Sequence, residues 1–224
     1  MVRSTFALTA LILLGLPAFA QAETPSIGIA EAQALFTAAR GQSAETLPPS
    51  LTAQSDLLVI LTLCGTAAPI QRSAQAATLL KSAEEAGQSI RALLDRVPGG
   101  SERFATWRLQ LDIVTERHPL ADLDQNELRA VLRPGLDGLC LRMERETVYL
   151  SPVALLRHFN ALDVVSSAYI AQVSAPLPAA YSCERIVTAS FIEEFPGGPA
   201  LALFRGNVPV SRTSADDIVK TLFR

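Results

Sequence analysis

The sequence contains few of the side chains that carry most metal and enzyme chemistry. Its 224 residues include two histidines, three cysteines and only two lysines, Lys81 and Lys220. A metal site needs several His, Cys, Asp or Glu residues at a recognisable spacing, which two isolated histidines and three scattered cysteines do not supply. The GxSxG, GxGxxG, P-loop and HExxH signatures are absent too. We therefore predict no metal and no cofactor, and the standard hydrolases and nucleotide-dependent enzymes are disfavoured.

Concentrated positive charge is also missing. The formal net charge is −3, and no block of Lys or Arg stands out. A protein that binds nucleic acid or an anionic membrane surface normally carries such a block. Beyond the N-terminal segment, no stretch has the length and lack of charge of a membrane-spanning helix. The sequence thus predicts no nucleic-acid partner and no stable membrane insertion once that segment is removed.

The first residues have the pattern of an export signal. Arg3 precedes an apolar run of about a dozen residues, and Pro17 then ends it. Small residues in an A-x-A pattern follow, and we place cleavage after Ala22. We predict a signal peptide over 1–22, a single domain over 23–224, and a secreted or periplasmic protein. An uncleaved N-terminal segment that anchors the chain is the alternative.

Hydrophobic periodicity indicates an α+β fold with a mixed or largely antiparallel sheet flanked by helices. Apolar residues at three- and four-residue spacing predict helices at 29–40 and 72–95. A continuous apolar run predicts a strand over 56–65 that is buried on both faces. Strict alternation in TWRLQLDIVTE predicts a half-buried strand, with Gln110 and Asp112 on its solvent face.

The second half of the chain carries turn and cap signals. Asp124 and Glu127 have capping-box spacing before a short helix, and Ser151 is followed by a proline in the manner of an N-cap. Between these helices, 137–150 alternates as a β-hairpin. A second hairpin is predicted around PGGP, followed by a last helix over 213–223.

The most distinctive stretch of the chain is PGLDGLCLRMERETVYLSP, which contains Cys140. The alternation places Cys140 on the polar side of the hairpin. As a nucleophile it would need a base, and His158, on the following helix, is the candidate. We favour instead a disulfide in an oxidising compartment, with Cys183 as the candidate partner and Cys64 as a small core residue. Tyr149 is the candidate ligand-binding aromatic, because its position in the alternation exposes it.

Three pieces of the chain resemble the AMMECR domain family. They are TLCGTAAPI, LQLDIVTERHPL and LRPGLDGLCLRMERETVYLSPVALL, which lie in the middle half of the sequence. The family's Arg-Gly-Cys-Ile-Gly run is absent, with only Cys64-Gly65 in its place, and Glu144-Arg145 replaces the glycine pair of its hairpin. The resemblance implies an α+β fold with a mixed or antiparallel sheet, and implies little about activity.

Three functions are compatible with these patterns. The first, which we favour, is an exported non-catalytic module that binds a protein partner or a small ligand. The second is an uncommon thiol-dependent enzyme that uses Cys140 and His158. The third is an accessory subunit of a secreted assembly. The adjacent carboxylates Glu193-Glu194 are interpreted as part of a solvated face and not as a catalytic acid pair.

Overall fold

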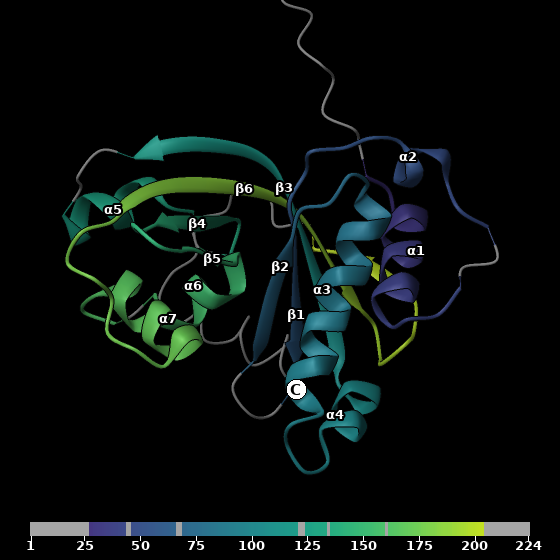
Figure 1. Cartoon of the computed structure of the whole chain (residues 1–224). Helices are drawn as coiled ribbons and strands as arrows, with labels where there is room; N and C mark the ends of the chain where they lie inside the picture. The colour runs from purple at the N-terminus through teal and green to yellow at the C-terminus, as the bar shows by residue number, and fades with distance from the viewer. Residues whose placement is uncertain are drawn as a thin grey trace, which may run out of the picture.

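The structure is a computed structural model that describes residues 27–43, 46–65, 69–120, 124–133, 135–159 and 161–203 (Figure 1). The predicted signal peptide and the predicted last helix lie outside these residues. The helices are α1 (Ile29–Ala39), α2 (Pro49–Thr52), α3 (Leu79–Leu94), α4 (Gly100–Thr106), α5 (Gln125–Val131), α6 (Pro152–His158) and α7 (Val164–Val173). The strands are β1 (Val59–Cys64), β2 (Ile70–Ala74), β3 (Arg108–Leu120), β4 (Asp137–Arg142), β5 (Thr147–Leu150), β6 (Ser182–Glu193) and β7 (Ala200–Ala202).

The strands form one sheet, and every strand pair in the described residues is antiparallel, which confirms the α+β prediction. The order is β2-β1-β3-β6-β4-β5, and β7 also pairs with β6. The two longest strands, β3 and β6, lie side by side and reach both groups of helices (Figure 1). Their register shifts between Val114 and Glu116. Such a bulge adds local twist and bends the strand, which helps the sheet to curve.

The curved sheet brings its two edge strands together through one side chain. The amide nitrogen of Gln71 on β2 donates to the carbonyl of Tyr149 on β5. The amide oxygen of Gln71 accepts from the backbone N–H of Ser151, 3.2 Å away. The sheet therefore has an inner face, which carries Thr62 and Asp112, and an outer face toward the helices α1 and α3.

Helices pack on the sheet in two groups. Helices α1 and α3 lie over β1 and β3, where Leu61, Leu111 and Ile113 are fully buried. Helices α5, α6 and α7 contribute to a second apolar cluster over β4 and β5, which includes Leu141 and Leu150. Figure 1 shows α5, α6 and α7 on one side of the molecule and α1, α2 and α3 on the other.

A glycine sets the distance between α1 and α3. A Cβ atom built on Gly87 would lie 2.0 Å from the backbone oxygen of Ala39. No side chain fits in that space without moving one of the two helices. Gly87, which weakens the helix by about 1 kcal/mol relative to alanine, is thus explained by close packing of the helix backbones.

The predicted helix over 72–95 is wrong at its start, and two short helices, α2 and α4, were not predicted. Its first residues belong to β2, and the helix begins after Thr78, whose hydroxyl accepts from the backbone N–H of Lys81. After the Pro-Gly-Gly stop, the chain forms helix α4, with Gly99 in the left-handed region at φ 71°. Gly99 therefore follows α3 and is also the N-cap of α4, so the Pro-Gly-Gly signal marks a short turn between two helices and not the start of a long loop.

The solvent face predicted for β3 is wrong as well. Gln110 and Asp112 are 1% and 0% exposed, because they lie on the inner face of the curled sheet. The Cys140 side chain, predicted on the polar side of the hairpin, is also fully buried on this face, against Leu58, Ile60 and Ile186. Alternation identified which residues share a face, but it could not show that the second face is covered too.

The cap and hairpin predictions are confirmed. Asp124 and Glu127 form the capping box of α5, and the Ser151 hydroxyl accepts from the backbone N–H of Ala154 at the start of α6. Strands β4 and β5 pair as the predicted hairpin, and β6 and β7 pair around the PGGP turn. No helix in the described residues has the length and apolar character needed to cross a membrane.

Candidate functional site

A cavity of about 350 Å³ lies between the sheet and the helices α6 and α7. Pockets of this size hold small ligands in many proteins. It draws residues from β1, β2, α6, α7 and the turns that join them. The lining residues are Thr62, Pro69, Gln71, Ser151, Val153, Ala154, Arg157, His158, Ala168, Ala171 and Gln172.

Local caps and hydrogen bonds hold the walls of this cavity in place. Ser151 begins α6 and is bound to Gln71 through its own backbone N–H. Asp163 begins α7 and accepts from the backbone N–H of Ser166 at 2.8 Å. The side chain of Gln172 on α7 donates to the carbonyl of Tyr149 at 3.0 Å. Both helices are thus tied to β5 or β2, so the walls of the cavity are fixed in place.

The lining is mostly apolar and built from small side chains. Val153, Ala154, Ala168 and Ala171 supply much of it. Two polar residues, Thr62 and Gln71, line it on the sheet side; Gln71 is hydrogen-bonded, whereas Thr62 is 2% exposed and its hydroxyl has no hydrogen-bond partner among the described residues. A buried hydroxyl without a partner costs about 1–3 kcal/mol. A ligand that bonded to Thr62 would remove this cost.

Two basic residues line the cavity from the last turn of α6. Burial, followed by the neighbouring charge of Arg157, lowers the pKa of His158 below its ordinary value, so the imidazole is neutral at pH 7. Burial also lowers the pKa of Arg157, while the nearby Cys64 thiol acts in the opposite direction. A guanidinium keeps its proton at any physiological pH. The cavity therefore carries one fixed positive charge and one neutral imidazole.

A buried polar row extends from Thr62 across the inner face of the sheet. Thr62 is paired in register with Gln110, and the amide of Gln110 donates to the carboxylate of Asp112 at 3.1 Å. The hydroxyl of Ser190 donates to the same carboxylate at 2.5 Å. The amide oxygen of Gln110, like the hydroxyl of Thr62, has no partner. The Asp112 carboxylate thus accepts hydrogen bonds from two side chains. The two atoms of this row without a partner, the hydroxyl of Thr62 and the amide oxygen of Gln110, belong to the paired residues at the cavity.

The structure does not bring the predicted pair Cys140 and His158 together. His158 lines the cavity, whereas Cys140 packs into the apolar cluster of the inner face and is not among the lining residues. Burial, with a smaller contribution from Glu184, raises the pKa of the Cys140 thiol. A buried thiol with a raised pKa is a poor nucleophile, because the thiolate is the reactive form.

The strand register separates the predicted disulfide partners. Cys183 on β6 is paired with Leu141, and Cys140 is paired with Glu184. Directly paired residues share a face, so Cys140 and Cys183 point to opposite faces of the sheet. All three cysteines are free thiols in this structure. The disulfide remains a prediction, and it would require β4 or β6 to shift.

Tyr149, the predicted ligand-binding aromatic, is partly buried. Its ring packs against the inner-face cluster, and the guanidinium of Arg117 lies 5.7 Å from the ring centre. Its backbone carbonyl accepts from Gln71 and Gln172, two residues of the cavity wall. Tyr149 therefore supports the cavity through its backbone, and its ring is not among the lining groups.

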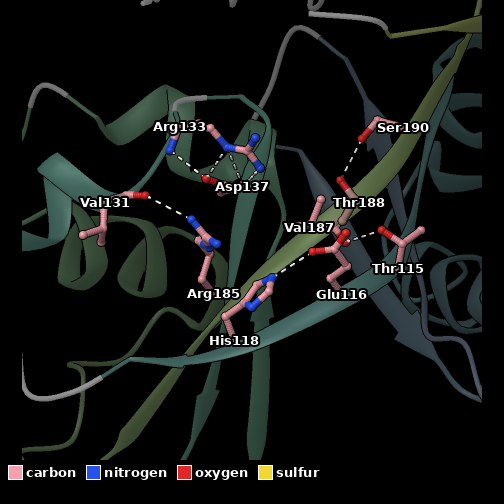
Figure 2. A network of polar contacts seen from close by, with 10 residues as sticks. All are labelled: Thr115, Glu116, His118, Val131, Arg133, Asp137, Arg185, Val187, Thr188 and Ser190. Atoms are coloured by element: carbon pink, nitrogen blue, oxygen red, sulfur yellow. Dashed lines mark hydrogen bonds and ion pairs between the residues drawn. The ribbon is translucent and has the colours of Figure 1, made fainter. Parts of the chain in front are cut away.

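A second, more open cavity has a volume of about 340 Å³. It lies beside residues 188–190 of β6, the short stretch between the part of β6 that pairs with β4 and the part that pairs with β7. Figure 2 shows the polar contacts of Arg133, Thr188 and Ser190, three of the residues that line it. Arg133 is bound to Asp137 at 2.8 Å, and the hydroxyls of Thr188 and Ser190 lie 2.9 Å apart. The other histidine of the chain, His118, is exposed and contacts Glu116. The polar groups of this cavity thus have partners in the protein, so the first cavity is the better candidate site.

Sequence reasoning found one residue of this cavity, His158, and missed the others that matter. Thr62 is part of an apolar run and resembles a core residue, and Gln71 precedes a helix predicted from periodicity. Arg157 had no signal beyond its position beside His158. Within the described ranges, no group of three or more His, Cys, Asp or Glu side chains could hold a metal ion.

No protein-family model matches the chain, and no curated protein matches it. Among solved structures, it is similar to the crystal structure of the uncharacterized protein PH0010 from Pyrococcus horikoshii. The TM-score is 0.59 at 16% sequence identity, over 79% of this chain and 98% of that chain. At this identity the likeness concerns the fold alone: the two chains share an architecture that extends over nearly all of the archaeal protein.

Proposed function

We propose that this chain is a non-catalytic binding module that holds a small ligand in the cavity between the sheet and the helices α6 and α7. The supporting observation is the buried, unpartnered hydroxyl of Thr62 on the wall of an apolar cavity of about 350 Å³. Ligand pockets typically combine an apolar lining with a few polar groups that fix orientation. This cavity has that composition, with Thr62, Arg157 and His158 as the polar groups.

A cavity-filling variant tests the proposal. Ala154→Leu adds three carbons to the cavity wall, and Ala130→Leu makes the same change at an exposed site on α5 outside the cavity. With 1-hexanol as the probe, we expect titration calorimetry or NMR shifts to detect saturable binding to the wild type and to Ala130→Leu, and none to Ala154→Leu. Equal binding of 1-hexanol by all three proteins, or a wild type that binds neither 1-hexanol nor its carboxylate analogue hexanoate, would contradict the proposal.

The thiol-dependent enzyme remains an alternative, and Cys140 decides it. Burial raises the pKa of Cys64 and of Cys183 to about 12, and raises that of Cys140 as well. We expect all three thiols to react with iodoacetamide at pH 8 far more slowly in the folded protein than in denaturant. One thiol that reacted rapidly in the folded state, identified as Cys140 by mass spectrometry, would favour the enzyme.

Three further predictions rest on the sequence alone: export, a role as an accessory subunit, and the resemblance to the AMMECR family. The apolar run before Ala22 supports export. Mass spectrometry of non-reduced protein from the periplasm would give the cleavage site and the state of the three cysteines in one measurement. Intact residues 1–22 in the recovered protein would contradict cleavage after Ala22.

A further inference from the structure

We infer that the ligand of this cavity is a small carboxylic acid with an apolar tail. The carboxylate is bound by Arg157 and Thr62, and the tail lies on the small side chains of α6 and α7. This inference rests on the proposed function, and it assigns the chemical class of the ligand. It follows from the sign of the charge in the cavity, the place of the polar groups and the character of the remaining wall.

The charge on the cavity wall has one sign. Arg157 contributes a permanent positive charge, and no Asp or Glu is among the described residues that line the cavity. Arg157 also has an interaction within the protein. Its guanidinium has five N–H donors in a planar fork, so it can serve an internal acceptor and a ligand together. An anion therefore gains a counter-charge in a partly desolvated place, where charge pairs are stronger than in water.

Thr62 and Arg157 both belong to the wall of this cavity. Thr62 and Cys64 lie two residues apart on β1 and so share the inner face of the sheet. Burial raises the pKa of the Cys64 thiol and Arg157 acts to lower it, so the positive charge of Arg157 acts on the face of β1 that carries Thr62. A carboxylate can accept from the guanidinium with one oxygen and, once the Thr62 side chain turns its covered, unpartnered hydroxyl toward the cavity, from that hydroxyl with the other. The neighbouring His158 adds a neutral ring at the same turn of α6.

The rest of the wall suits an alkyl chain. Ala154, Ala168, Ala171 and Pro69 present methyl and methylene groups and no further charge. Gln71 and Gln172 also line the cavity, but both side-chain amides bind the backbone of the β5 region. A sugar or a nucleotide, which needs many hydrogen-bond partners, would find few there. An apolar tail buries its surface against this wall at about 25 cal/mol per Å².

A matched pair of probes tests the assignment: hexanoate and 1-hexanol, which share an alkyl chain and differ in the charge of the head group. We expect wild-type protein to bind hexanoate at least tenfold more tightly than hexanol by titration calorimetry at pH 7.5, or about 1.4 kcal/mol. Arg157→Gln should reduce this ratio to near one. Arg96→Gln, which removes the same charge at an exposed site outside the cavity, should keep it.

Each outcome separates the assignment from the proposed function. If wild-type protein binds both probes equally, the carboxylate assignment is overturned and the small-ligand function stands. If it binds neither probe, the proposed function fails as well. If Arg157→Gln does not fold, Thr62→Val decides: a ratio that falls at least threefold supports the assignment, and an unchanged ratio overturns it.

Discussion

Strand β3 has two buried faces, and they differ in how the protein covers them. The outer face carries Leu109, Leu111 and Ile113, which pack under α1 and α3 in an apolar cluster without an exposed member. The inner face carries Gln110 and Asp112, which are equally inaccessible but are joined by hydrogen bonds. Beside the inner face lies the cavity with the unpartnered hydroxyl of Thr62.

This difference separates stability from binding within one sheet. Close-packed apolar surface stabilises the fold through each methylene it buries, and it leaves no room for a ligand. Buried polar groups stabilise little on balance and are costly when unpaired. The inner face retains two such unpaired atoms, on Thr62 and Gln110. We therefore expect substitutions on the outer face to be more harmful to folding than substitutions beside the cavity.

The largest effect should come from the buried ion pair at the edge of the outer face. Nε of Arg40 donates to Glu193 at 2.7 Å, and the backbone N–H of Leu109 donates to the same carboxylate at 2.7 Å. Glu193→Gln leaves the guanidinium buried without its counter-charge, so we expect the free energy of unfolding to fall by about 3–5 kcal/mol in urea titration. Glu84→Gln removes an exposed partner of Lys81 and should cost less than about 1 kcal/mol. Equal losses in the two variants would contradict this account.

Gly87→Ala tests the close approach of α1 and α3 with one carbon atom. The new Cβ would lie 2.0 Å from the backbone oxygen of Ala39, so a helix must shift. Overpacking of this kind costs about 1–3 kcal/mol, even though alanine favours the helix by about 1 kcal/mol. We expect a net loss of about 1–2 kcal/mol by thermal unfolding, because the Cβ would meet backbone atoms and the overpacking cost lies in the upper part of its range. Ser89→Ala, at an exposed position of α3, should change stability by less than about 0.5 kcal/mol. A stabilised Gly87→Ala variant would show that the helices are not in close contact.

The outer face was predictable from sequence because its cause is local. The apolar run of β1 and the apolar periodicity of α3 each identify residues of that cluster. Each pattern can be recognised within a single helix or strand, without knowledge of the fold. The inner face has a nonlocal cause. Gln110 and Asp112 read as solvent-facing, and only the curl of the sheet, with Gln71 bridging β2 to β5, covers them.

The candidate site was less predictable than the fold for the same reason. Thr62, Arg157 and Ala168 lie on β1, α6 and α7. Spacing along the sequence does not predict that these three elements lie next to one another in the fold. Glu193, interpreted as part of a solvated face with Glu194, is fully buried because Arg40 of a distant helix reaches it. Cys140 was a candidate site residue because the chain has few cysteines, but the small number of cysteines does not predict whether this one is buried. Caps such as Ser151 were predictable, since the capping residue and the backbone it binds are three residues apart.

Thr62→Val should raise the free energy of unfolding, whereas the outer-face variants lower it. Valine keeps the shape of threonine and replaces a buried hydroxyl that has no partner. Removal of an unsatisfied buried group relieves its desolvation cost, so we expect the free energy of unfolding to rise by about 1 kcal/mol in urea titration. Thr188→Val removes a hydroxyl that is bonded to Ser190 and should lower it by about 1 kcal/mol. A loss of stability in Thr62→Val as large as that in Gly87→Ala would mean that the faces do not differ.

The smallest effect should be a pH dependence that comes from His158 beside the cavity. Burial, and then the charge of Arg157, lowers the pKa of His158 in the folded protein below its ordinary value of about 6.5. As the pH falls below about 6.5, the unfolded chain therefore takes up a proton that the folded protein resists, and stability is lost. We expect the Tm of His158→Gln to fall less between pH 7.5 and pH 5.5 than that of the wild type. His118→Gln, at an exposed position beside Glu116, is the matched control. If the Tm of His158→Gln falls as much as that of the wild type over this range, burial does not lower the pKa of His158 in the folded protein.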